Sequence, residues 1–228
     1  MFFDPTMIIL LPGIILALWA QGLVSSTFNK YKNVRSFSGM TGAEVARSLL
    51  DSAGLFDVAI EPVRGSLTDH YNPRTRVLGL STDVYGSTSV AAIGVAAHEV
   101  GHAIQHNKKY APLLIRNAIV PIANIGNYFS WILLMIGILF AISNFIYIGI
   151  LFFLGVVIFQ LITLPVEFDA SKRAMSELES RNILIGDEVK GAKKVLKAAS
   201  MTYVAAAATA VLQLIRLITI AGRYDDRS

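Results

Sequence analysis

The fifty residues from Asn117 to Val166, NAIVPIANIGNYFSWILLMIGILFAISNFIYIGILFFLGVVIFQLITLPV, contain no charged side chain. As one helix they would be about 75 Å long, more than twice the roughly 30 Å thickness of the hydrocarbon core of a bilayer. We therefore expect two spans, Ile119 to Ile142 and Phe145 to Leu164, joined by a turn at Ser143–Asn144. This stretch predicts a chain folded in a membrane.

The composition of the whole chain supports this prediction. Of its 228 residues, 54% are hydrophobic and only 16% are charged, whereas about a quarter of the residues of a soluble domain are charged. The sequence contains no cysteine, so a disulfide-rich secreted module is excluded. Any metal ion must therefore be held by nitrogen and oxygen ligands.

The N-terminal region carries another apolar run, from Met7 to Val24, which is long enough for one crossing. A cleaved signal peptide would have positive residues before its apolar run and small residues at a cleavage site. Here the positive residues follow the run, at Lys30, Lys32 and Arg35. We therefore expect an uncleaved anchor with its N-terminus outside.

A fourth candidate segment extends from Ala198 to Ile220 and is interrupted by Gln213 and Arg216. It either spans the bilayer, with Arg216 facing protein or snorkelling, or forms a buried or surface helix. The expected fold class is a mainly α-helical membrane protein with four transmembrane helices, or three if this segment does not span.

The positive residues are unevenly distributed along the chain. The stretches Ser25–Arg116 and Glu167–Ser200 contain 10 and 7 of the 20 Lys and Arg residues. Both stretches belong in the cytoplasm by the positive-inside rule. The expected order is an N-terminal anchor (1–28), a cytoplasmic domain (29–116), a transmembrane hairpin (117–166), cytoplasmic helices (167–200) and a C-terminal membrane helix (201–228).

Several lysines follow one another in the second of these stretches, at Lys190, Lys193, Lys194 and Lys197. Such a run could bind anionic lipid or nucleic acid, but no aromatic or arginine-rich pattern accompanies it. We expect a solvated face beside the inner leaflet and no nucleic-acid partner.

The cytoplasmic domain is predicted to be α+β. Thr41-Gly-Ala-Glu44 is a capping box that opens a helix. A helix capped by Ser87 and ending near Asn107 is apolar nearly all round, which is typical of a helix buried in a core. Between the two helices, extended segments and an Asn-Pro turn predict a small sheet with a hairpin, with strands near 58–63, 65–71 and 76–80.

The segment His98-Glu-Val-Gly-His102 lies in the predicted buried helix. His98 and His102 are four residues apart, so both project from one face and can reach one ion. Glu99 is rotated by about 100° and lies beside the ion. Zinc hydrolysis needs these groups, because the metal lowers the pKa of a bound water and the carboxylate moves its proton. The pattern predicts one catalytic Zn²⁺ per chain with Glu99 as the general base, and the burial of the helix argues against a chance motif.

A catalytic zinc needs a third protein ligand and an open position. We expect Glu167, because a hairpin of two crossings returns the chain to the side of His98 and Pro165 is expected to end the span. Asp169 is the alternative ligand, or an outer hydrogen-bond partner of an imidazole. His106 is too far along its helix to share the ion, and is expected to be an outer partner or a structural residue.

His70 lies on the predicted hairpin, in the string Thr68-Asp69-His70-Tyr71. We expect Asp69-His70-Tyr71 to border the substrate cleft, and His70 to donate a hydrogen bond to the oxyanion of the tetrahedral intermediate. The edge of the hairpin would offer backbone groups to an extended peptide.

Five strings carry a resemblance that covers nearly the whole chain: Gly39-Met-Thr-Gly, Glu61-Pro-Val-Arg-Gly, Leu67-Thr-Asp-His-Tyr, Val95-Ala-Ala-His-Glu-Val-Gly-His-Ala-Ile-Gln-His106 and Leu164-Pro-Val-Glu-Phe-Asp-Ala-Ser171. Together they resemble the YugP-like membrane zinc metallopeptidases of bacteria. The resemblance implies an integral membrane zinc peptidase, with His98 and His102 as ligands, Glu99 as catalytic residue and Glu167 as third ligand.

The chain is also similar to the HtpX and CAAX-protease group of gluzincins, which implies a zincin-like catalytic domain. In that group a later helix supplies the third ligand within a Glu-x-x-x-Asp pattern. Here the fourth position after Glu167 is Ser171. The partner that replaces the aspartate is not given by the pattern.

The leading hypothesis is a membrane-anchored endopeptidase of the bacterial inner or plasma membrane, acting from the cytoplasmic face on membrane or misfolded proteins. An intramembrane site-2-type protease would need an Asp-Gly ligand motif in a later span, and the sequence contains no Asp-Gly. A catalytically silent membrane scaffold or a zinc-sensing protein is the alternative from another class. The intact Glu99 argues against silence.

Overall fold

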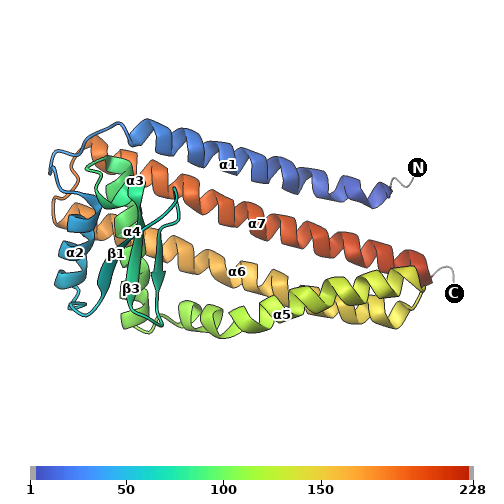
Figure 1. The fold of residues 1–228 in the computed structure, drawn as a ribbon. Coiled ribbons are helices and arrows are strands. Elements are labelled where there is room, and N and C mark those ends of the chain that lie inside the picture. Colours follow the sequence, from blue (N-terminus) through green and yellow to red (C-terminus); the bar gives the residue numbers. More distant parts are fainter. Residues whose placement is uncertain (1–3, 226–228) are drawn as a thin grey trace. The chain divides into compact units, whose positions relative to one another are not determined.

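The computed structural model describes residues 4–225, which form one 3₁₀-helix, seven α-helices and three strands (Figure 1). In chain order these are η1 (Pro5–Leu10), α1 (Leu11–Tyr31), α2 (Gly42–Ser52), β1 (Ala59–Val63), β2 (His70–Asn72), β3 (Val77–Ser81), α3 (Thr82–Tyr85), α4 (Val90–Asn107), α5 (Ala111–Leu139), α6 (Ser143–Ser180) and α7 (Asp187–Asp225).

The chain divides into two compact units that alternate along the sequence. The membrane-helix unit contains the chain up to Ala20, Leu114–Pro165, and the chain from Thr202 onward. The α+β unit contains Gln21–Leu113 and Val166–Met201. Helices α1, α5, α6 and α7 each contribute one part to each unit.

Four described helical segments are long and apolar enough to cross a membrane: Pro5–Tyr31, Ala111–Leu139, Ser143–Ser180 and Asp187–Arg223. The expectation of four candidate spans is therefore confirmed, including the segment interrupted by Gln213 and Arg216. Within the membrane-helix unit, Leu134 of α5, Phe153 of α6 and Leu217 of α7 belong to one buried apolar cluster.

Arg216 is compensated by a carboxylate from the other end of the chain. Its guanidinium lies 2.8 Å from Asp4, at the cap of η1, and 3.1 Å from the hydroxyl of Thr6. Arg223 lies 3.7 Å from the same carboxylate. An ionised group in an apolar helix is costly unless it is paired, so this ion pair explains how α7 can carry an arginine in its apolar segment.

Three predicted boundaries were wrong. The hairpin turn lies at residues 140–142, and Ser143 is the first residue of α6. The cap of α4 is Ser89, whose hydroxyl accepts from the backbone N–H of Ala92, and not Ser87. Pro165 does not end the span, because α6 continues through it to Ser180. A proline removes one backbone hydrogen bond, a loss that apolar helices tolerate where neighbouring groups satisfy the freed carbonyl.

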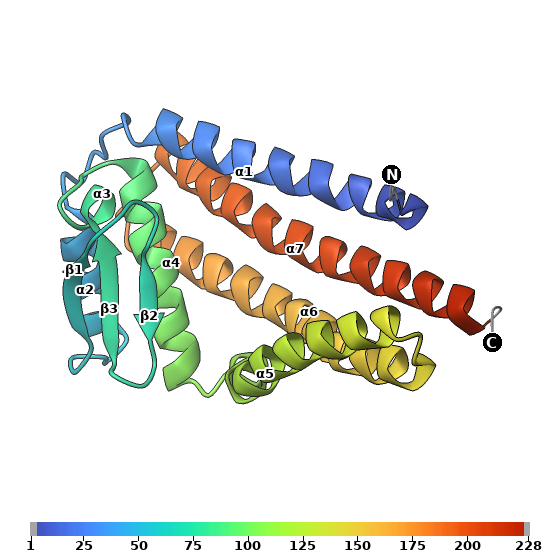
Figure 2. The same ribbon diagram turned by 45° about the vertical axis from the view of Figure 1, so that its right-hand side comes forward.

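The α+β unit contains the predicted hairpin and one further strand. Strand order is β1-β3-β2, with β1 parallel and β2 antiparallel to β3. The capping box at Thr41 and Glu44 opens α2 as predicted. Figure 2 shows β2 at the edge of the sheet, with α4 beside it. Much of the segment expected to be a strand before Tyr71 is loop, and β2 is only three residues long.

Helix α4 is the centre of the core of the α+β unit. Most of its side chains are buried, among them Ile93, Ala96 and Val100, and they pack with apolar residues of α2, β3, α6 and α7. Helix α4 is apolar nearly all round because neighbouring elements pack against it on several sides.

Helices α4 and α6 meet backbone to backbone at Gly101. A Cβ placed on this glycine would lie 2.5 Å from the carbonyl oxygen of Ala170 and 3.1 Å from its carbonyl carbon. Gly94, two turns earlier on α4, is different, since a Cβ there would lie 3.4 Å from Ala192, an ordinary van der Waals contact. Only Gly101 is needed for the close approach of α4 and α6.

We expect Gly101→Ala to destabilise the α+β unit by about 1–3 kcal/mol, because an extra methyl group against a backbone forces two packed helices apart. Gly94→Ala is the matched control, and should leave stability unchanged or raise it by up to about 1 kcal/mol through helix propensity. Thermal unfolding of the detergent-purified variants measures both. Equal unfolding temperatures for the two variants would contradict the close contact.

Candidate metal centre

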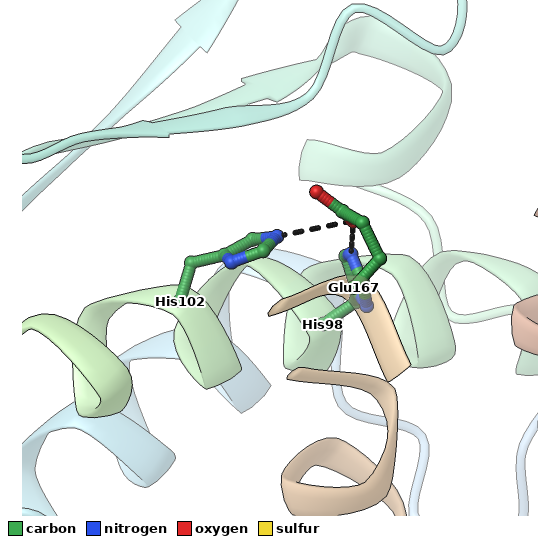
Figure 3. Close-up of side chains that lie close together, drawn as sticks. All are labelled: His98, His102 and Glu167. Atoms are coloured by element: carbon green, nitrogen blue, oxygen red, sulfur yellow. Dashed lines mark hydrogen bonds and ion pairs between the residues drawn. The ribbon is translucent and has the colours of Figure 1, made fainter. Parts of the chain in front are cut away.

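Helices α4 and α6 bring His98, His102 and Glu167 together inside the α+β unit (Figure 3). The Nε2 atom of His98 lies 3.3 Å, and that of His102 3.5 Å, from the same Oε2 atom of Glu167. One ligand atom from each of the three residues lies within 4.8 Å of the others. The two rings are edge to face, with centroids 4.7 Å apart.

The local sequence explains this arrangement. The spacing of four residues places both imidazoles on one face of α4. Because α6 continues past Pro165, Glu167 and Ser171 are one turn apart on a single helix. The glycine at position 101 then allows this part of α6 to approach the histidines.

Each imidazole also contacts a polar side chain at its Nδ1 atom. Ser171 Oγ lies 3.1 Å from Nδ1 of His98. Gln105 Oε1 lies 3.0 Å from Nδ1 of His102. Both Nε2 atoms are thus left to face Glu167, and hydrogen bonds of this kind fix the orientation of metal-binding histidines.

The buried carboxylates of the site favour positive charge beside them. Glu167 is 2% exposed and Glu99 is 8% exposed, so two carboxylates are buried beside the imidazoles. Burial lowers the pKa of His102, but the hydrogen bond with Glu167 and the charges of Glu99 and Glu167 more than offset this, so the net shift of its pKa is upward. An arrangement that stabilises the positive charge of a protonated imidazole also stabilises a metal cation bound between the same side chains.

The donor set fits zinc. Two imidazole nitrogens and one carboxylate oxygen are ligands that zinc takes in catalytic sites, which leave a fourth position open. The Nε2 atoms lie 3.3 and 3.5 Å from the Oε2 atom, which is close enough for all three atoms to bind one ion. The three residues named as ligands from the sequence are therefore the three that the structure brings together.

The structure places Asp169 outside this cluster. Its Oδ2 atom accepts from the side-chain amide of Gln105 at 2.8 Å and from Nε of Arg173 at 2.6 Å. Asp169 is therefore linked to His102 through Gln105. Of the two roles predicted for it, this contact fits an outer partner.

His106 lies one turn beyond His102, and its Nδ1 atom is 3.0 Å from the hydroxyl of Tyr71 on β2. His70, the neighbouring strand residue, is not brought to the cluster. Its exposed ring lies beside Gly79, on the face of the sheet opposite Tyr71, and its Nδ1 atom is 2.9 Å from the carbonyl of Thr68. Strand alternation thus directs Tyr71, and not His70, toward α4.

Sequence reasoning did not find Gln105 or Ser171 as site residues. Gln105 had a usable signal, since a glutamine three residues after His102 lies on the same side of the helix and a polar side chain in a buried helix needs a partner. For Ser171 the signal was its place in the Glu-x-x-x-Asp pattern. Tyr71 was expected only to border the substrate cleft, and its contact with His106 follows from the register of the hairpin.

Comparison with known proteins agrees with this donor set. Residues 6–222 match the model of a family described as "Putative neutral zinc metallopeptidase". The chain belongs to this family. It is also 49% identical over 205 residues to the "Putative membrane protease YugP" of Bacillus subtilis (strain 168), covering 90% of this chain and 91% of that protein. No solved structure matches the chain significantly.

The contact between Ser171 and His98 gives a testable expectation. Ser171→Ala removes the hydroxyl beside Nδ1, and loss of such a partner typically weakens metal binding by about 10–100-fold. Ser171→Asp supplies a stronger acceptor at the same place and should keep or raise the affinity. Competition with a chelating dye measures zinc affinity, and Ser176→Ala, at an exposed serine of the same helix, is the control. Equal affinity of Ser171→Ala and the control would rule out this role.

Proposed function

We propose that the protein is a membrane-anchored zinc endopeptidase that hydrolyses peptide bonds with Glu99 as general base. The observation that carries the proposal is the group of His98, His102 and Glu167, assembled from two helices with a buried glutamate next to the first histidine. Membership in a zinc metallopeptidase family supports the same reaction class.

Metal binding and proton transfer are carried out by different residues. His98, His102 and Glu167 would hold one zinc ion, which lowers the pKa of a bound water and polarises the substrate carbonyl. Glu99 accepts the proton of the attacking water and then delivers it to the nitrogen of the leaving amine. Because Glu99 is buried, its carboxylate acts away from bulk water, where its interaction with developing charge is stronger.

Strand β2 supports a place for the substrate. It is an edge strand of the sheet and contacts α4 through Tyr71 and His106. An extended peptide could add to this edge through backbone hydrogen bonds. The ring of His70 lies on the other face of the sheet, so His70 is not included in the proposed catalytic set, and its predicted oxyanion role lacks support from this placement.

We further propose that the α+β unit lies in the cytoplasm of a bacterial cell, at the inner or plasma membrane. The support is the charge distribution, with 17 of 20 Lys and Arg residues in residues 25–116 and 167–200. A site on the cytoplasmic side, attached to membrane helices, would act on membrane proteins or on misfolded proteins.

The metal and base roles separate by mutation. His98→Ala, His102→Ala and Glu167→Ala should each lose most bound zinc, because a catalytic zinc with two protein ligands is weakly held. Glu99→Gln should keep near-full zinc and lose about 10²–10⁴-fold in turnover, since only proton transfer is removed. Metal content by atomic emission and turnover of a denatured protein substrate measure the two effects.

Glu179→Gln, at an exposed glutamate of α6, is the control for Glu99→Gln and should behave as the wild type. Full zinc content in Glu167→Ala would show that the third ligand is a different residue. Retained turnover in Glu99→Gln would exclude this mechanism. Zinc binding without turnover in the wild type would favour the silent scaffold or zinc sensor.

The orientation is tested with single cysteines, since the chain has no native cysteine. Exposed positions are available on both sides of the proposed bilayer: Ser66 and Ser176 in the α+β unit, and Asn144 in the first turn of α6, next to the hairpin turn. An impermeant thiol reagent added to intact cells should label Asn144→Cys alone. Labelling of Ser66→Cys and Ser176→Cys without Asn144→Cys would reverse the topology.

A further inference from the structure

Gln105 is a polar side chain at the centre of the α+β unit. It is 0% exposed, and three hydrogen-bond partners surround its amide group: His102, Val166 and Asp169. We propose that Gln105 is a positioning residue that fixes the tautomer and orientation of His102, and that Asp169 acts by fixing Gln105. This inference rests on the proposed zinc site.

The partners determine which way the amide points. The Nε2 atom of Gln105 lies 2.8 Å from the carbonyl oxygen of Val166 and 2.8 Å from Oδ2 of Asp169. A backbone carbonyl and a carboxylate only accept hydrogen bonds, so the NH₂ group must lie on their side. Rotating the amide by 180° would place its oxygen against two acceptors and leave both without a donor, which is costly in a buried site.

The orientation of the amide then determines which ring nitrogen of His102 carries the hydrogen. Its Nδ1 atom faces the amide oxygen of Gln105 at 3.0 Å. An amide oxygen cannot donate, so Nδ1 must carry the hydrogen. In the neutral imidazole the lone pair is consequently on Nε2, the atom that faces Glu167 and would bind the metal.

Gln105 is itself held through Asp169. The carboxylate of Asp169 accepts a hydrogen bond from Nε of Arg173 at 2.6 Å. The guanidinium of Arg173 lies 5.6 Å from the ring centre of Tyr110. The backbone N–H of Tyr110 donates to the carbonyl oxygen of Gln105 at 2.9 Å. The series Tyr110, Arg173, Asp169 and Gln105 therefore ties the end of α4 to α6 around His102.

The two histidines are supported unequally. His98 faces Ser171, whose hydroxyl can accept or donate by rotating, so this contact permits either tautomer. His102 faces a carbonyl oxygen that cannot rotate away. We therefore assign to Gln105, and not to Ser171, the role of keeping the hydrogen of one imidazole on Nδ1, so that Nε2 is the nitrogen that gives up its proton and binds the metal.

Zinc affinity of the purified full-length protein tests this inference. Gln105→Leu removes the acceptor at Nδ1, and should weaken zinc binding by about 10–100-fold in competition with a chelating dye. It should also change the visible absorption spectrum of the Co²⁺-substituted protein, which reports ligand geometry and which a loss of stability alone does not alter. Gln213→Leu, at a buried glutamine in the membrane-helix part of α7, is the matched control and should leave both readings unchanged.

Exchanging the amide of Gln105 and the carboxylate of Asp169 distinguishes a positioning role from general packing. Gln105→Glu keeps an acceptor for His102 but sets a carboxylate against Asp169 and the carbonyl of Val166. Adding Asp169→Asn supplies an amide donor to that carboxylate. The double variant should therefore bind zinc more tightly than Gln105→Glu alone, and this comparison stands even if Gln105→Leu does not fold.

The outcomes distinguish the inference from the proposed function. If the wild type binds no zinc, both are overturned. If the wild type binds zinc, the inference alone is overturned by a Gln105→Leu variant with wild-type affinity and cobalt spectrum, or by a double variant no tighter than Gln105→Glu.

Discussion

The backbone contact between α4 and α6 at Gly101 is the constraint on which the rest of the site depends. All three candidate ligands and both of their Nδ1 partners lie on these two helices. A side chain at this position would meet the carbonyl of Ala170, one residue before Ser171. The glycine of the HEVGH segment thus has a packing reason that is independent of the chemistry of its neighbours.

That contact places charged and polar groups in a buried setting, where each must be satisfied. Glu167 faces two imidazoles, and Gln105 uses its oxygen and its NH₂ group on three partners. A polar network of this kind is stabilising only when every member has its partner. The hydrogen-bond pattern and the metal preference are therefore two aspects of one arrangement, because the groups that hold the imidazoles also set which nitrogen is available.

Sequence reasoning succeeded where a local rule determines the geometry. Helical spacing was sufficient to pair His98 with His102, and counting membrane crossings was sufficient to return Glu167 to their side. It failed where the outcome depends on tertiary contacts. Pro165 disfavours a helix interior by local propensity, yet α6 continues through it, and the choice between Ser87 and Ser89 as cap depended on a single hydrogen bond. His70 and Tyr71 are adjacent in sequence, and only the register of β2 against β3 shows which of them faces α4.

The three candidate ligands, and the residues at the Nδ1 atoms of the two histidines, belong to the α+β unit, whose boundary on α6 falls between Pro165 and Val166. None of the three candidate ligands comes from the apolar part of α6 that precedes Val166. Spans adapt to bilayers of different thickness by changing their tilt. Because all three ligands lie within one unit, the distances among His98, His102 and Glu167 depend on the packing of α4 against α6 at Gly101, and not on the apolar segments.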